Sequence, residues 1–176
     1  LSRTQAEENL NDYLIRNGVV CIHGVDTRAL VRHIRIYGAM NAVISTEISD
    51  IKELAKFLET VPNMEGLELA SKVSTEKSYL LGNPDSKFRL AAMDYGIKKS
   101  ILKQLEEMGF YIKVFPAKTT IQDINAWNPD AYFLSNGPGD PEVMHYAIET
   151  VTAMIATRKP VFGICLGHQL VNLALG

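Results

Sequence analysis

The sequence has little cysteine, little net charge and no long apolar run, and each shortage excludes a class of protein. Two cysteines in 176 residues are too few for a disulfide framework or a cysteine-built zinc site, and they indicate a reducing compartment. The sequence contains no stretch of about 18 apolar residues, so it predicts no membrane span. Its first residues lack the basic-then-apolar order of a signal peptide. A formal net charge of −2 provides no basic surface for nucleic acid or for an anionic membrane. We therefore expect a cytoplasmic protein that binds neither.

Two nucleotide-binding motifs are also missing from the sequence. The chain contains no Gly-x-x-x-x-Gly-Lys-Ser/Thr, and no Gly-x-Gly-x-x-Gly follows the first strand expected in its second half. We therefore expect no nucleotide site in this chain.

The second half of the sequence shows a regular alternation of strand and helix patterns. Expected strands span residues 89–93, 111–115, 131–134 and 161–164, and expected helices span residues 97–108, 120–127 and 142–156. Alternation at this spacing predicts right-handed crossovers and a parallel sheet with helices on both faces. The predicted fold class is therefore α/β, with a doubly wound parallel sheet whose ligands bind beyond the carboxyl ends of the strands.

The first half mixes the two patterns. Helical spacing begins near Leu10, Asp26 and Asp50, and short strands are expected at residues 19–22 and 42–44. This mixture indicates a smaller α/β domain.

A change of rhythm separates the halves. Residues 65–87 are polar and weakly periodic, which is typical of a domain boundary. We therefore predict one domain over residues 1–85, part of a smaller mixed α/β domain, and a second over residues 86–176, which forms the parallel sheet.

The segment Gly163-Ile-Cys-Leu-Gly-His-Gln169 follows the apolar run 160–162, so a buried strand is predicted to turn into a helix at Cys165. Such a sharp turn needs small residues two positions before and after its apex, because a Cβ there collides with the neighbouring backbone. Gly163 and Gly167 meet this need. A thiol at a helix N-terminus faces unpaired amide donors and the positive end of the helix dipole, which stabilise a thiolate. Cys165 is therefore the candidate nucleophile.

The alternative for any free cysteine is a small buried apolar residue. We interpret Cys21 in this way, as part of a strand core, because it lies in the apolar run 19–22. The paired glycines and the strand-to-helix context favour the reactive interpretation for Cys165.

A glycine-rich loop, Ser135-Asn-Gly-Pro-Gly-Asp-Pro141, follows the third expected strand of the second half. Its glycines allow backbone amides to approach a ligand, and its prolines stiffen it. Acyl transfer needs two donors near the developing oxyanion, and the residue after the nucleophile, Leu166, usually provides one. The loop is the candidate for the second donor; the alternative is a rigid turn before a helix that Pro141 opens. Asp94 ends another strand at the same edge and is predicted to cap a helix.

The histidines do not complete a catalytic triad. His168 lies three residues after Cys165, but on a helix that begins at the elbow it should point away from the sulfur or into packing, so we predict a structural role. His23, His33 and His145 have no acidic partner at a useful spacing.

Four motifs resemble those of one family. Phe162-Gly-Ile-Cys-Leu-Gly-His-Gln169 and Leu134-Ser-Asn-Gly-Pro-Gly-Asp-Pro141 resemble the motifs of class I glutamine amidotransferases. Asp26-Thr-Arg28 and Ala92-Met-Asp-Tyr-Gly-Ile-Lys98 are similar in particular to the small subunit of carbamoyl phosphate synthetase. The resemblance extends over essentially the whole chain.

This resemblance implies an origin for each domain. Residues 1–85 resemble the C-terminal part of the small subunit's N-terminal domain. Residues 86–176 resemble the N-terminal half of its amidotransferase domain.

The resemblance also implies a role for each matching residue. Cys165 is expected to attack the side-chain amide of L-glutamine, releasing ammonia and leaving a glutamyl thioester that water hydrolyses. Leu166 is expected to donate its backbone amide to the oxyanion and Gln169 to help hold the substrate. Gly137 and Gly139 are expected to line the glutamine pocket.

The implied partner is a large synthetase subunit, which combines the ammonia with bicarbonate and ATP for arginine or pyrimidine synthesis. ATP and Mg are expected only in that large subunit. The small subunit is expected to need no metal or cofactor.

In this family the histidine and glutamate of the triad lie downstream of the elbow, whereas this sequence ends eleven residues after Cys165. We therefore expect the parent protein to be a glutaminase and this piece to have little or no turnover. Two alternatives remain open. The first is a non-catalytic docking module, in which residues 1–85 bind a synthetase subunit and the elbow is retained only as scaffold. The second is a cysteine hydrolase on the same fold that acts on another amide or ester.

Overall fold

The computed structural model describes residues 8–176, and the chain divides after Met64 into two compact units. No helix within this described range is both long enough and apolar enough to cross a membrane.

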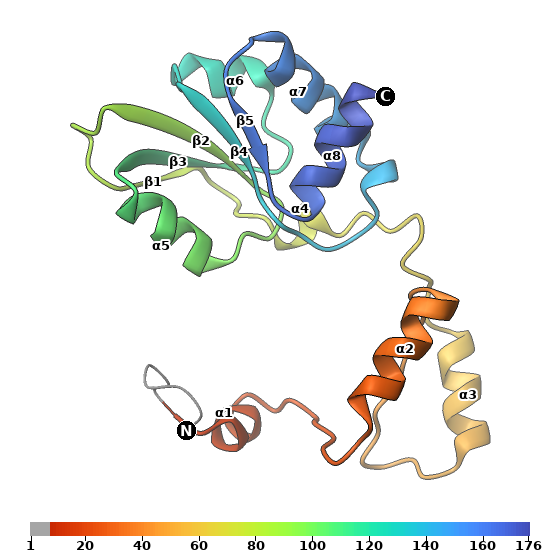
Figure 1. Ribbon diagram of the computed structural model, residues 1–176. Coiled ribbons are helices and arrows are strands. Elements are labelled where there is room, and N and C mark those ends of the chain that lie inside the picture. The colour runs from red at the N-terminus through yellow and green to blue at the C-terminus, as the bar shows by residue number, and fades with distance from the viewer. Residues whose placement is uncertain (1–7) are drawn as a thin grey trace. The chain divides into compact units, whose positions relative to one another are not determined.

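The described part of the first unit contains three helices, α1 (Leu10–Arg16), α2 (Thr27–Tyr37) and α3 (Ile51–Glu59) (Figure 1). Each follows a residue whose side chain accepts a hydrogen bond from the first helical turn, namely Asn9, Asp26 and Asp50. These caps satisfy backbone donors that the helix itself leaves unpaired. The helices expected near Leu10, Asp26 and Asp50 are therefore confirmed, and Asp26 and Asp50 are the caps that the sequence indicates.

The two strands predicted in the first half are wrong. Residues 19–22 and 42–44 form neither helix nor strand, and Cys21, expected in a strand core, is exposed. A strand exists only through hydrogen bonds to a neighbouring strand. Within residues 8–64 no segment pairs with either one, so their apolar composition does not produce a sheet.

The second unit, Glu65–Gly176, is built on a single five-stranded sheet in the order β1-β3-β2-β4-β5. The strands are β1 (Tyr79–Leu81), β2 (Phe88–Asp94), β3 (Phe110–Pro116), β4 (Ala131–Leu134) and β5 (Val161–Gly163). Strands β2 to β5 run parallel, and only β1, at one edge of this sheet, is antiparallel to its neighbour. The carboxyl ends of β2, β3, β4 and β5 therefore meet along one edge.

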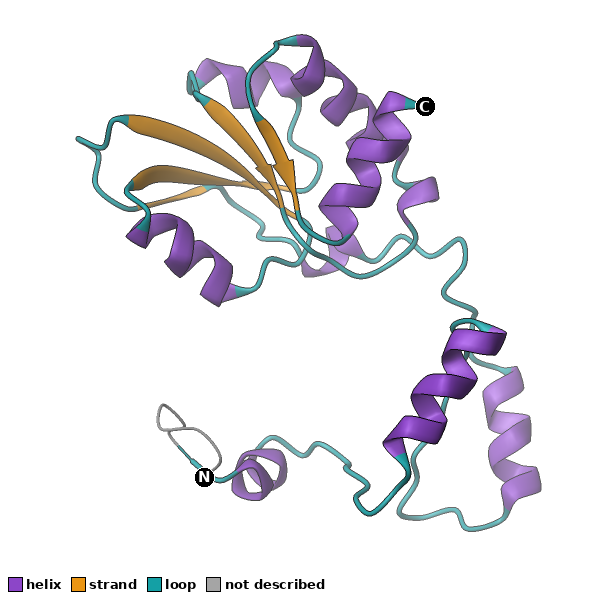
Figure 2. Ribbon diagram, viewed as in Figure 1, coloured by secondary structure: helices purple, strands orange, loops and turns teal. Residues whose placement is uncertain are grey.

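Helices cover both faces of this sheet (Figure 2). Helix α5 (Lys99–Glu107) packs on one face against a cluster that includes Leu90, Ile112 and Phe133. The other face carries α6 (Ile121–Ala126), α7 (His145–Ala156) and α8 (Leu166–Leu175), packed on a larger cluster around Met93 and Leu134. These helices on both faces confirm the predicted doubly wound α/β fold. A sheet covered on both faces requires continuous apolar strands, which is the pattern seen in the sequence.

The division between the units lies earlier than the sequence predicts. The predicted boundary follows residue 85, whereas the observed division follows Met64. Strand β1 explains the difference, because Tyr79 pairs with Val114 of β3 and places residues 79–81 in the sheet. A three-residue antiparallel edge strand leaves almost no periodic pattern in a polar sequence.

Two short helical turns complete the second unit. Helix α4 (Ala70–Val73) lies near the carboxyl ends of the parallel strands (Figure 1), and a 3₁₀ turn, η1 (Pro141–Val143), precedes α7. Pro141 occupies the first turn of η1, where its missing N–H costs nothing.

Candidate functional site

Cys165 lies at the turn between β5 and α8. Its backbone dihedrals are φ 53° and ψ −112°, it forms the N-cap of α8, and it is exposed. A positive φ is uncommon for a residue with a Cβ and costs of order 1–3 kcal/mol, so it persists only where the surrounding structure enforces it. The predicted strand-to-helix elbow is present, with an accessible sulfur at its apex.

Two glycines make this turn possible. A Cβ built on Gly163 would lie 2.5 Å from the carbonyl carbon and oxygen of Gly167. A Cβ built on Gly167 would lie 2.3 Å from the carbonyl oxygen of Leu134. Backbone therefore occupies the space that any side chain would need, which is the physical reason for the glycine spacing in the sequence.

Hydrogen bonds fix the start of α8 to the neighbouring strand. The Gly167 N–H donates to the carbonyl oxygens of Ser135 and Ile164, each at 3.0 Å, and the Ile164 N–H donates to the carbonyl of Leu134 at 3.0 Å. The Gln169 N–H donates to the carbonyl of Cys165 at 3.1 Å. These bonds hold the elbow against the end of β4.

Leu166 and Gln169 differ in what they present. The Leu166 side chain is buried, while its backbone N–H has no acceptor among residues 8–176. A free donor one residue after the candidate nucleophile is what an oxyanion site requires. The Gln169 side chain is exposed one helical turn further along.

The glycine-rich loop lies directly beside the elbow. A Cβ built on Gly137 would lie 2.1 Å from the carbonyl oxygen of Tyr95 and 2.8 Å from Cδ2 of Leu166. Asn136 fixes the loop on its other side, since its Nδ2 donates to the Gly96 carbonyl at 2.9 Å and its Oδ1 accepts from the Lys98 N–H at 3.2 Å. The structure thus brings together the two segments singled out in the sequence, at the carboxyl ends of β4 and β5.

Gly139 occupies a different part of the loop. Its φ is 99°, and a Cβ there would lie 2.8 Å from the carbonyl oxygen of Leu67 and 2.9 Å from the N of Leu69. Gly139 therefore packs closely against residues that precede the sheet.

Ser135 is a site residue that the sequence reasoning did not single out. It is fully buried, its Oγ accepts from the Tyr95 N–H at 2.9 Å, and its hydroxyl donates to the carbonyl of Asn136 at 2.7 Å. A hydroxyl placed directly after a buried apolar strand is the signal that would have indicated it, because a buried polar side chain needs partners.

Asp94 acts differently from its predicted role. It caps no helix, since the N-cap of α5 is Lys98. Its Oδ1 accepts from the N–H groups of Gly96 and Ile97 at 2.9 and 2.8 Å, and its Oδ2 accepts from the Thr75 N–H at 2.8 Å. The carboxylate therefore closes the turn after β2 and ties residue 75 to it.

His168 is exposed, and its Nε2 lies 3.3 Å from Nδ2 of Asn172, one turn further along α8. This contact runs along the helix, so the ring lies on the surface and not in packing. In the part of the chain that the structure describes, no histidine forms an ion pair with a carboxylate.

Comparison with known proteins agrees with the motifs. Residues 91–176 match the family model described as glutamine amidotransferase class-I. Residues 1–44 match the model for the CPSase domain of the carbamoyl-phosphate synthase small chain.

Several curated relatives match along almost the entire chain. The carbamoyl phosphate synthase small chain of Chlorobaculum tepidum is 46% identical over 177 residues, covering 99% of this chain and 48% of the relative. The protein of the same name from Nostoc sp. is 42% identical over 190 residues, covering 99% and 49%. That from Neisseria meningitidis serogroup A is 43% identical over 188 residues, covering 99% and 50%. The chain therefore spans about half the length of the curated relatives it matches.

Proposed function

We propose that the whole protein hydrolyses L-glutamine at Cys165, because residues 91–176 match the class-I glutamine amidotransferase model and the chain is similar over almost its full length to carbamoyl phosphate synthase small chains. The ammonia released would pass to a large synthetase subunit. The observation that supports this proposal most directly is an exposed thiol at a strained helix N-cap, beside a free backbone N–H and a glycine-rich loop.

The reaction proceeds in two steps that exchange bonds at one carbon. The Cys165 thiolate forms a bond to Cδ of glutamine while the N–H of Leu166 stabilises the developing oxyanion, and the Cδ–N bond then breaks. The departing nitrogen takes a proton and leaves as ammonia, which gives a glutamyl thioester. Water hydrolyses the thioester to glutamate and restores the thiol.

The remaining assignments complete this proposal. Gly137 and Gly139 belong to the loop that borders the substrate, and Gln169 helps to hold it. Thioester chemistry needs a nucleophile, oxyanion donors and an acid–base pair, so we assign no metal or cofactor to this subunit and place ATP and Mg in the large one. A free thiol nucleophile suits a reducing compartment, and we place the protein in the cytoplasm.

Selective labelling tests the proposal with a control inside the same chain. Cys21 and Cys165 are both exposed, so a small alkylating agent such as iodoacetamide should reach both. A chloroketone analogue of glutamine should label Cys165 at least about tenfold faster than Cys21, because only one thiol lies at a helix N-terminus beside oxyanion donors. Glutamine should compete with this labelling, and Cys165→Ser should abolish it.

Equal and slow labelling of the two cysteines would contradict the glutaminase assignment. That result would favour a docking module in which the elbow is scaffold. Labelling of Cys165 by other amide or ester analogues, with no preference for glutamine, would instead indicate a cysteine hydrolase of different specificity.

A further inference from the structure

One segment outside the predicted motifs contacts the site from an unexpected direction. Residues 66–75, here called the edge segment, include α4 and lie along the carboxyl ends of the parallel strands (Figure 1). It ends at Thr75, which donates to Asp94 at the end of β2, and the neighbouring Ser74 Oγ accepts from the Ala117 N–H just after β3. The segment therefore contacts two strand ends through its last residues, while its first residues contact the glycine-rich loop.

Asp140 makes the closest connection between this segment and the loop. Its Oδ2 accepts from the Gly66 N–H at 2.8 Å, and its own N–H donates to the Leu67 carbonyl at 2.9 Å. Its Oδ1 accepts from the Glu142 N–H at 3.0 Å, which is the ordinary cap of η1. The two carboxylate oxygens thus have separate tasks, one local and one that spans 74 positions of sequence.

Gly139 also contributes to the contact between the glycine-rich loop and the edge segment. Its positive φ and the missing Cβ allow the loop to lie against the backbone of Leu67 and Leu69. A loop held at this point and also at Asn136 has little freedom to move its amides away from Leu166.

Glu68 attaches the edge segment to α7. Its Oε1 accepts from the Tyr146 hydroxyl and the Ser71 N–H, each at 2.9 Å, and its Oε2 accepts from the Ser71 hydroxyl. Lys118 lies over the Tyr146 ring, with Nζ 5.5 Å from the centroid.

The hydrogen bonds to Ser71 and Tyr146 outweigh partial burial and lower the pKa of the Glu68 carboxyl. The N–H groups of Gly66 and Glu142 lower the pKa of Asp140 in the same way. Both side chains are therefore held as carboxylates.

We propose that Asp140 and Glu68 are positioning residues for glutamine, acting through the edge segment to hold the loop 135–140 in the form that accepts the substrate. This inference rests on the proposed glutaminase function. Neither carboxylate touches the reacting atoms, so each should affect how tightly the substrate binds more than how fast the thiol reacts.

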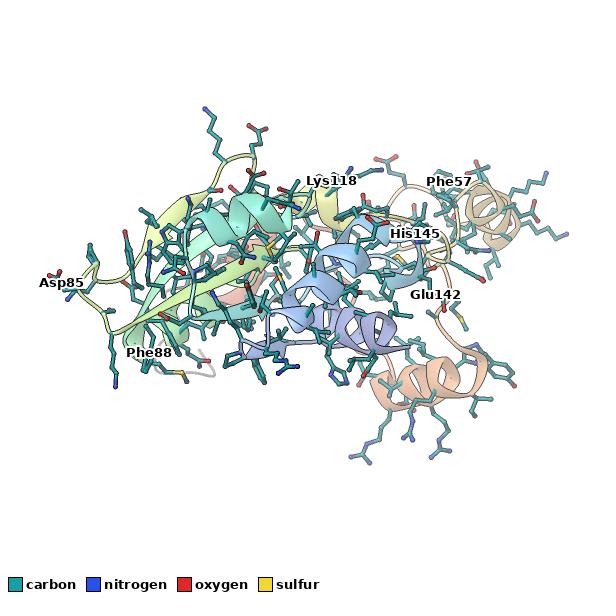
Figure 3. All side chains as sticks on the ribbon, turned by 90° about the horizontal axis from the view of Figure 1, so that it is seen from above. Phe57, Asp85, Phe88, Lys118, Glu142 and His145 are labelled. Carbon is teal, nitrogen blue, oxygen red and sulfur yellow. The ribbon has the colours of Figure 1, made fainter. Side chains whose placement is uncertain are left out.

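The Asp140→Asn variant separates the two tasks of this side chain. The remaining oxygen can still cap η1, whereas the amide NH₂ would face the Gly66 N–H with no acceptor for it. Glu142→Gln is the matched control, because Glu142 (labelled in Figure 3) is the neighbouring exposed carboxylate. Its side chain accepts no hydrogen bond among the described residues, since only its backbone N–H is bonded, to Asp140.

Saturation kinetics of Cys165 labelling in the 176-residue chain measure both quantities. With the chloroketone analogue of glutamine, Asp140→Asn should raise the half-saturating concentration about five- to tenfold, since a hydrogen bond to a charged acceptor is lost. The limiting labelling rate should stay within about twofold, and the iodoacetamide rate, which needs no pocket, should not change. Tyr146→Phe, which removes only the hydroxyl that binds Glu68, should raise the half-saturating concentration about two- to threefold.

Three outcomes would overturn the inference. In the first, the half-saturating concentration of the analogue is the same in Asp140→Asn, in Tyr146→Phe and in the unsubstituted 176-residue chain. In the second, Glu142→Gln shifts that concentration as much as Asp140→Asn does. In the third, Asp140→Asn slows labelling by iodoacetamide and by the analogue equally. If the unsubstituted 176-residue chain shows no saturation with the analogue, the proposed function fails first, and this inference fails with it. Should Asp140→Asn not fold, Tyr146→Phe decides alone.

Discussion

At the residue scale, Cys165 combines exposure with a backbone conformation that most side chains avoid. Its φ of 53° and ψ of −112° lie in a region that favours glycine. The bonds from Gly167 to Ser135 and Ile164 enforce the turn. Strain of this kind is often retained at functional sites, which agrees with the role proposed for Cys165.

The Cys165→Gly variant should therefore be more stable than Cys165→Ala by about 1 kcal/mol, because relief of 1–3 kcal/mol of backbone strain exceeds the entropy that glycine adds to the unfolded chain. Urea unfolding of the two variants measures the difference. At Cys21, whose φ is not positive, the same pair should show the opposite order or no difference. If Ala proves the more stable residue at position 165 as well, the turn is not strained.

The residues that sequence could and could not predict differ in the range of their contacts. Gly163, Cys165 and Gly167 were predicted because a tight turn requires particular residue types at neighbouring positions of the sequence. Asp140 and Glu68 were not found, because their partners Gly66 and Tyr146 lie 74 and 78 positions away. Such long-range pairs leave no periodic signal in a single sequence.

At the element scale, the parallel strands were predictable because helices cover both of their faces. Strand β2 has five consecutive buried residues at its carboxyl end, and the first four of them, residues 90–93, form an apolar run in the sequence. The predicted strands at 19–22 and 42–44 show the limit of this signal. Their composition is equally apolar, but a strand also needs a partner, and no described segment of the first unit supplies one.

The turn after β2 offers a test at this scale. Asp94→Asn should lower the free energy of unfolding by about 1–3 kcal/mol, because the new NH₂ cannot accept the Thr75 N–H in a buried position. Asp85→Asn is the control. Asp85 projects from an exposed turn (Figure 3), and its side chain accepts no hydrogen bond among residues 8–176, so the change should stay within about 0.5 kcal/mol. Guanidinium unfolding of both variants checks the difference, and equal effects would show that Asp94 does not secure the turn.

At the scale of the whole molecule, the two units differ in how much apolar surface they bury. Residues 8–64 contain no buried side chain, whereas the second unit has two buried apolar clusters on opposite faces of its sheet. The candidate site lies entirely in the second unit, on the edge where parallel α/β sheets bind ligands. The chemistry is therefore to be sought in that unit, although the relatives extend to about twice the length of this chain.

The chain of 176 residues should be a poor glutaminase even though Cys165, the proposed nucleophile, lies at the elbow. Within residues 8–176 no side chain forms a hydrogen bond to the Cys165 sulfur, and His168 instead contacts Asn172 along α8. Loss of general acid–base catalysis costs about 10²- to 10⁴-fold, while the thiol and the N–H of Leu166 remain. Ammonia release from glutamine should therefore be at least about a hundredfold slower than that of the full-length Chlorobaculum tepidum relative measured alongside. Cys165→Ser should remove whatever rate remains. Hydrolysis as fast as that of the full-length relative would mean that a residue of this chain serves as the base.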